Sequence, residues 1–123
     1  MTARYFKDQI CEELDGACNY LKKALDSFVQ HPEWAEHFRD MADMEQEHAT
    51  TLYKMFMEMY AKSQGKDSYM TSVRDSIMDC FSTKMRKIED LKSTYEICET
   101  SAEVEEMQKE YAHAPGYVPV MQQ

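Results

Sequence analysis

Apolar residues recur every three or four positions along three long stretches of this chain. That spacing is typical of helices with one buried face. His31 and Pro32 interrupt the pattern once, and a polar segment around Gly65 interrupts it again. Proline fits the first turn of a helix, so a new helix is expected directly after His31. The predicted helices cover residues 4–30, 33–62 and 69–98, and a short further helix is expected at 101–112.

Both connections between the long stretches are short, so consecutive helices are expected to be antiparallel neighbours. The chain has 123 residues with only three glycines and three prolines, which favours an all-α protein with one modest core. Residues 1–113 are expected to form one helical domain. Residues 114–123 contain a Pro-Gly break next to their start and are expected to form a non-helical tail.

The apolar stripe of the second stretch contains two polar residues, Glu45 and His48. They are three positions apart, so they lie one above the other on the face expected to look into the core. An isolated carboxylate there costs several kcal/mol unless it is compensated, and a metal ion compensates it well. Alternatively, the two residues pair with each other or lie at the edge of the stripe, facing water.

Glu13 on the first stretch belongs to the same level of the predicted hairpin. A turn centred near residues 30–31 places Glu13 opposite His48 and within one helical turn of Glu45. These three side chains are therefore expected to converge. Two carboxylates and one imidazole at one height are ligands of the kind that bind iron or manganese.

Glu13, Tyr20, Glu45 and His48 together resemble the ligand pattern of the ferritin-like superfamily, which includes ferritins, bacterioferritins, rubrerythrins and the short encapsulated ferritins. The segment Met-Ala-Asp-Met-Glu-Gln-Glu-His-Ala around Glu45 is also similar, and the likeness covers residues 6–60. The resemblance implies a di-iron or di-manganese carboxylate site. By the same resemblance, Glu45 bridges both metals while Glu13 and His48 hold one each. Carboxylate and imidazole donors would also accept zinc. Tyr20 would hydrogen-bond a ligand carboxylate, or is an ordinary aromatic at the core edge.

The second half of the chain departs from this family pattern, because no acidic residue lies squarely on the apolar stripe of residues 69–98. A second Glu-x-x-His occurs at Glu110 and His113, beside a Pro-Gly break. With Glu89 it forms a weak candidate for a second half-site, the alternative being a fraying helix end. A single half-site favours a homodimer, or a higher oligomer built from dimers, in which two hairpins complete a four-helix bundle about a two-fold axis.

The reaction implied by the resemblance is oxidation of Fe(II) by dioxygen or peroxide, with or without iron storage. The sequence does not separate a ferroxidase from a peroxidase or an oxidase. The competing hypothesis is a non-catalytic helical interaction or assembly module with a vestigial metal site. No Cys-x-x-Cys pair is present, which argues against a built-in rubredoxin-like electron-transfer unit.

Charge and composition narrow the partners further. The net charge of −9 argues against a nucleic-acid partner, whose binding needs a basic surface. No run of about 18 apolar residues is present and no apolar signal region opens the chain, so we expect no membrane association. The cysteines are expected to be reduced thiols of a cytoplasmic protein, with enclosure in a protein compartment as an alternative. They are Cys11, Cys18, Cys80 and Cys98.

Overall fold

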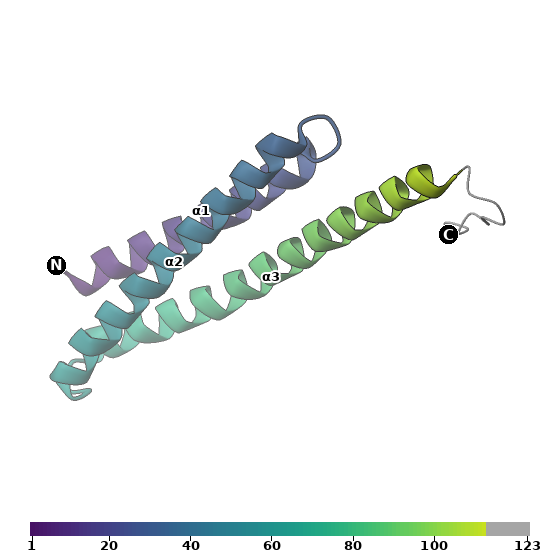
Figure 1. The fold of residues 1–123 in the computed structure, drawn as a ribbon. Helices are drawn as coiled ribbons and strands as arrows, with labels where there is room; N and C mark the ends of the chain where they lie inside the picture. The colour runs from purple at the N-terminus through teal and green to yellow at the C-terminus, as the bar shows by residue number, and fades with distance from the viewer. Residues whose placement is uncertain (113–123) are drawn as a thin grey trace.

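The computed structural model describes residues 1–112, which form three long helices and, within that range, no strand. The helices are α1 (Ala3–Ser27), α2 (Pro32–Ser63) and α3 (Ser68–Tyr111). α1 and α2 form an antiparallel hairpin, and α3 turns back to run in the same direction as α1 (Figure 1). The prediction of an all-α fold is confirmed. The tail predicted at residues 114–123 lies outside the described residues.

α3 is one continuous helix, so the prediction of a separate short helix at residues 101–112 was wrong. Its 44 residues correspond to a length of about 66 Å. The break was expected at Glu99 and Thr100, which are at most mildly unfavourable inside a helix, and no glycine or proline stands between Asp67 and Tyr111. The yellow end of α3 therefore extends beyond the connection between α1 and α2 (Figure 1).

The helix boundaries follow from local chemistry. Pro32 occupies the first turn of α2, where its missing N–H removes no helical hydrogen bond. Gln64 and Gly65 both take positive φ angles, of 53° and 70°, and reverse the chain after α2. The Asp67 carboxylate then accepts hydrogen bonds from the backbone N–H groups of Tyr69 and Met70, which caps the start of α3.

α1 is the centre of the fold, because its backbone lies close to both other helices, whereas α2 and α3 meet mainly through long side chains such as Tyr53 and Phe81. Its buried face carries mostly large apolar side chains, including Ile10, Leu14 and Leu21, which are fully buried. α2 contributes small residues at intervals of seven, whereas α3 contributes larger ones. The buried residues of α2 are Ala35, Ala42, Ala49 and Phe56, and those of α3 are Val73, Ile77, Ile88 and Tyr95.

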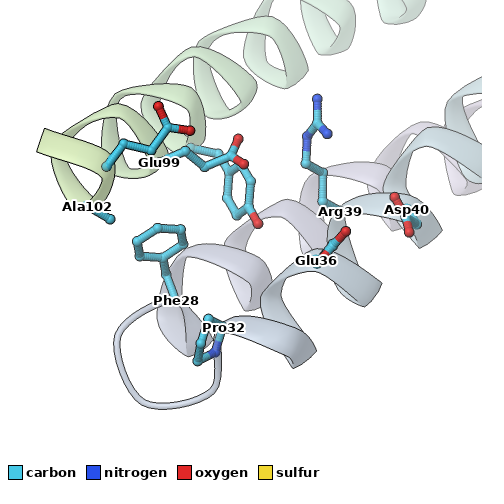
Figure 2. Close-up of a pocket in the computed structure, with 9 residues that line it drawn as sticks. Phe28, Pro32, Glu36, Arg39, Asp40, Glu99 and Ala102 are labelled. Carbon is cyan, nitrogen blue, oxygen red and sulfur yellow. The ribbon is translucent and has the colours of Figure 1, made fainter. Parts of the chain in front are cut away.

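The far part of α3 packs on the end of the hairpin. The ring of Tyr95 meets the ring of Phe28 edge to face, at a centroid distance of 5.5 Å. The Arg39 guanidinium lies 5.7 Å from the centre of the Tyr95 ring. A cavity of about 330 Å³ opens beside these groups, between Pro32 and Glu99 (Figure 2). The contact between Tyr95 and Phe28 holds α3 against the connection of the hairpin.

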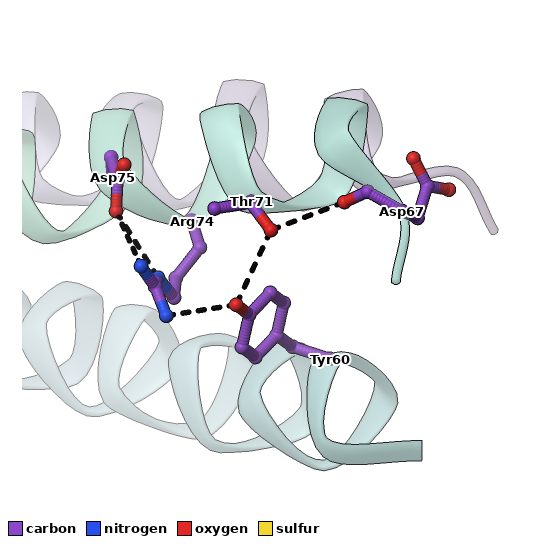
Figure 3. Close-up of polar contacts among 5 residues, drawn as sticks. All are labelled: Tyr60, Asp67, Thr71, Arg74 and Asp75. Atoms are coloured by element: carbon purple, nitrogen blue, oxygen red, sulfur yellow. Dashed lines mark hydrogen bonds and ion pairs between the residues drawn. The ribbon is translucent and has the colours of Figure 1, made fainter. Parts of the chain in front are cut away.

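The first turns of α3 are held to the end of α2 by a polar network (Figure 3). Arg74 donates a hydrogen bond of 2.8 Å to the Tyr60 hydroxyl and two more to Asp75. The Tyr60 hydroxyl also lies 3.3 Å from that of Thr71. α3 is thus fixed near its start and again at Tyr95. Along residues 1–112, no helix has the length and apolar character needed to cross a membrane.

Candidate metal centre

Glu13 of α1 meets Glu45 and His48 of α2 at one level of the hairpin. Each residue offers a ligand atom, and the three atoms lie within 4.8 Å of one another. His48 Nδ1 is 3.6 Å from Glu13 Oε2. Within residues 1–112, this is the one group of three or more histidine, cysteine, aspartate or glutamate side chains that could hold a metal ion. The structure therefore brings together the three residues that the sequence singled out.

A glycine on α1 makes room for this arrangement. A Cβ atom added at Gly16 would lie 3.2 Å from Glu45 Oε2, which is tighter than an ordinary contact. Gly16 therefore leaves the space that the Glu45 carboxylate occupies over α1, close to Glu13. The alanines on the buried face of α2 also allow the two helix backbones to approach closely. Small residues at this seam are what place ligands from two helices within reach of one ion.

The electrostatics of the cluster favour a cation. The pKa of Glu45 is raised to about 7, first by a hydrogen bond with Glu13 and then by burial and the negative charge of Glu13. The proximity of His48 acts in the opposite direction. Two carboxyl groups this close retain a proton between them, and a divalent ion would replace that proton. Two carboxylates and one imidazole suit iron, manganese or zinc, so the residues present fit a metal ion.

The cluster does not lie in the core of the single chain, which corrects one expectation. The His48 side chain is 56% exposed and the Glu13 side chain 22% exposed. The buried line of α2 runs through Ala42 and Ala49, so Glu45 and His48 lie on its flank. Among the described residues no charged side chain is fully buried. The ligand group therefore opens at the edge of the α1–α2 seam.

Tyr20 lies on the same helix as Glu13, but its contacts are with other groups. Its ring stacks on that of Phe38 at a centroid distance of 6.3 Å, and the Lys23 ammonium lies 5.5 Å from the Tyr20 ring centre. Within the described part of the chain, no hydrogen bond joins the Tyr20 hydroxyl to Glu13 or Glu45. A role for Tyr20 in orienting a ligand carboxylate stays a prediction.

The candidate second half-site is not assembled within one chain. Glu89 and Glu110 are both exposed on α3, and His113 lies outside the described residues. The two glutamates are separated by about six helical turns, roughly 30 Å along one straight element. They cannot bind the same ion in one chain, because α3 continues without a break from the first glutamate to the second.

A thiol pair is the feature that the sequence reasoning missed. Cys11 Sγ of α1 and Cys80 Sγ of α3 lie 2.7 Å apart, on the other side of α1 from the ligand group. One turn further along both helices, Lys84 donates a hydrogen bond to Asp15. Cys11 and Asp15 are four residues apart on α1, and Cys80 and Lys84 are four residues apart on α3. This is the spacing expected when two helices run in parallel with matched register. That shared spacing was the available signal.

A family model described as rubrerythrin matches residues 8–118, which is most of the chain. The chain belongs to the rubrerythrin family. The ferritin-like assignment made from Tyr20 and the three candidate ligand residues is thereby confirmed. No curated protein and no solved structure shows a significant match to the chain. Rubrerythrin-family domains typically bind two iron ions through carboxylates, which agrees with a metal-binding role for this protein in general terms.

Proposed function

We propose that this protein is a ferritin-like iron protein that binds a di-iron centre through Glu13, Glu45 and His48 and oxidises Fe(II). The observation that carries the proposal is the convergence of these three ligand atoms within 4.8 Å. Membership in the rubrerythrin family supports the class of metal site. The raised pKa of Glu45 also supports the proposal, because it means that the metal-free cluster holds a proton which a cation would displace.

The proposal includes a second copy of the chain. One chain contributes two carboxylates and one imidazole from its described residues, which is half of a two-metal ligand set. A two-fold axis beside the cluster would bring the same three residues from a partner and complete a four-helix bundle. The exposure of the His48 side chain, 56%, supports this arrangement, because a partner hairpin would bury it.

A row of exposed apolar side chains on α2 supports a dimer interface on the same surface. These residues share the face of α2 that carries His48, because they are spaced from it by about one or two turns or by whole heptads. Methionine and tryptophan are enriched in protein interfaces. An apolar stripe around an incomplete ligand group is therefore what a dimer would cover. The exposed residues are Trp34, Met41, Met44 and Met55.

The roles of the individual residues follow from their positions. A bound di-iron centre would supply the oxidation of Fe(II) by dioxygen or peroxide. By resemblance to ferritin-like sites, Glu45 would bridge the two metal ions after losing its proton. Glu13 and His48 would each hold one ion, and Tyr20 would orient a ligand carboxylate. Mn(II) or Zn(II) would be accepted by the same oxygen and nitrogen donors.

Analytical ultracentrifugation over a dilution series tests the shared site. Metal binding and association must be linked if two chains share the ions, so the metal-free protein should dissociate at higher concentrations than protein loaded with Fe(II) or Mn(II). Glu45→Ala should lose the metal-dependent association, while Glu47→Ala, an exposed neighbour on the same helix, should keep it. A chain that stays monomeric while binding two metal ions would overturn the shared site.

A non-catalytic helical module is the second candidate. The distal part of α3, beyond Tyr95, favours it because it presents exposed Ile97, Val104 and Met107, which no other described helix covers. Such a face suits an assembly contact. Metal analysis of protein purified without chelator, together with the rate of Fe(II) oxidation in air, separates the two. Substoichiometric metal after Fe(II) loading, with no oxidation above the buffer rate, favours the module.

A further inference from the structure

The thiols of Cys11 and Cys80 face each other across the contact between α1 and α3. Their sulfur atoms lie 2.7 Å apart and both residues are half-buried. A disulfide bond is about 2.05 Å long, so the two atoms need to approach by less than about 1 Å. The other two cysteines have no such neighbour among the described residues: Cys18 is buried in the core and Cys98 lies far along α3.

We propose that Cys11 and Cys80 form a redox-active dithiol, which hydrogen peroxide oxidises to a reversible disulfide between α1 and α3. The surroundings fix the register that this bond needs. One turn along both helices the Lys84 ammonium pairs with Asp15. The fully buried Leu14 and Ile77 hold the two helices together beside the thiols.

The chemistry balances with one peroxide per pair of thiols. The sulfur of one cysteine attacks a peroxide oxygen, the O–O bond breaks, and a sulfenic acid and one water are formed. The second thiol then attacks the sulfenic sulfur, the S–O bond breaks, and the hydroxide leaves as a second water with the thiol proton. Two thiols lose two electrons in total, and peroxide is reduced to two waters.

The order of the two steps follows from the environment of Cys80. Burial and the hydrogen bond with Cys11 raise the pKa of the Cys80 thiol to about 12. A thiol that keeps its proton is a poor nucleophile toward free peroxide. Cys11 is therefore assigned the first attack, and Cys80 completes the disulfide from its position against the Cys11 sulfur.

The disulfide would change how firmly α3 is held. The backbone of α3 packs mainly against α1, and its contacts with α2 are made by long side chains such as Arg74 and Tyr60, so a covalent bond to α1 reinforces its main attachment. A bond between Cys11 and Cys80 closes a loop of about 70 residues, which strongly restricts the unfolded chain. On the loop-entropy estimate, the oxidised protein should melt higher than the reduced one by on the order of 10 °C.

Peptide mapping of the full-length protein after treatment with hydrogen peroxide tests the proposal. Free thiols are alkylated under denaturing conditions, and the digest is compared with and without dithiothreitol. We expect one cross-linked peptide pair containing Cys11 and Cys80, lost on reduction, together with the rise in Tm. Cys11→Ser and Cys80→Ser should lose both effects, whereas Cys18→Ser and Cys98→Ser should retain both.

Three results would overturn the proposal. These are free Cys80 beside over-oxidised Cys11, a cross-link through Cys18 or Cys98, and disulfide-linked dimers as the main product. The variant Glu45→Ala shows whether disulfide formation depends on the metal centre, because it removes a proposed ligand and leaves both thiols in place. The same intrachain cross-link is expected in Glu45→Ala and in the metal-free protein, so the outcome does not depend on iron binding.

Discussion

α1 contacts α2 and α3 through side chains of different size. Toward α2, the contact at the level of the ligand group is made through small residues, with Gly16 on one side and alanines such as Ala42 and Ala49 on the other, while aromatic pairs such as Phe6 and Phe56 pack further along. Toward α3, α1 meets larger side chains, including Ile77 and Ile88. We call these contacts the α2 seam and the α3 seam.

The difference in side-chain size gives the two seams different roles: the α2 seam positions the ligands and the α3 seam fills the core. The small residues beside the ligand group in the α2 seam let carboxylates on two helices reach one point, which long apolar side chains at that level would prevent. The α3 seam holds branched side chains that bury more apolar area per residue and so contribute more to stability. Glu13 and Cys11 are only two residues apart, yet one belongs to the polar cluster of the α2 seam and the other to the α3 seam.

Removing a ligand from the α2 seam should have the largest effect. We expect Glu45→Ala or His48→Ala to weaken Fe(II) binding by more than about a hundredfold, since changing even an outer partner of a metal ligand commonly costs 10–100-fold. Folding should survive, because Glu45→Ala removes a repulsion between carboxylates in the metal-free cluster and the His48 side chain is largely exposed. Isothermal titration with Fe(II) under anaerobic conditions measures the loss. If both variants bound Fe(II) with wild-type affinity, the assignment of Glu45 and His48 as metal ligands would be wrong.

Substitutions in the α3 seam and in the α2 seam should differ in their effects on stability and on Fe(II) binding. Ile77→Ala, in the α3 seam, should lower the free energy of unfolding by about 2–5 kcal/mol and leave Fe(II) affinity unchanged in the folded protein. Ala49→Leu, in the α2 seam, should cost about 1–3 kcal/mol and also weaken Fe(II) binding, because it forces α2 away from α1. Urea unfolding and metal titration of both variants measure the two quantities. Equal losses of affinity would remove the distinction between the seams.

The sequence predicted most of this arrangement from local pattern. Helical periodicity and the His31-Pro32 break located the hairpin, and antiparallel register placed Glu13 beside Glu45 and His48. These inferences succeed because a short connection between two regular helices leaves little freedom in their relative height.

What the sequence did not predict depends on how α1 and α3 meet. The register of α3 against α1 is set by packing over a long sequence separation, so the approach of Cys11 to Cys80 was missed. The sequence left open whether His48 faces the core or lies at the edge of the stripe, because periodicity does not distinguish the middle of an apolar stripe from its flank, and the structure places it at the edge. Closure of the ligand group by a second copy remains a prediction.

The pH dependence of the metal-free protein should report on the α2 seam. The pKa of Glu45 is about 7 in the folded chain, above its usual value of 4.5, so the folded state holds this proton longer than the unfolded state. Its contribution to stability is present below about pH 4.5 and is lost as the pH rises through 7. Urea unfolding between pH 4.5 and 7.5 should show this decline in the wild type and less of it in Glu45→Gln. The exposed Glu47→Gln is the matched control, and the same slope in all three proteins would contradict the assignment.

Gly16→Ala should have the smallest effect on stability and is the sharpest test of the α2 seam. Alanine inside a helix is favoured over glycine by about 1 kcal/mol, and Gly16 does not have a positive φ that alanine would resist. The added Cβ would lie 3.2 Å from Glu45 Oε2, at the end of a flexible side chain that can swing aside at little cost. The free energy of unfolding should therefore rise slightly, by up to about 1 kcal/mol.

The same Cβ occupies space that the Glu45 carboxylate needs in order to stay near Glu13, so Fe(II) affinity should fall several-fold while the fold becomes more stable. Asn19→Ala, at an exposed position on α1, is the control: it also replaces a weaker helix former but shortens the side chain and adds no Cβ, so it should raise stability and leave Fe(II) affinity unchanged. Thermal unfolding and metal titration of both variants separate the two effects. If Gly16→Ala bound Fe(II) as the wild type does, the space above Gly16 would not be what positions Glu45.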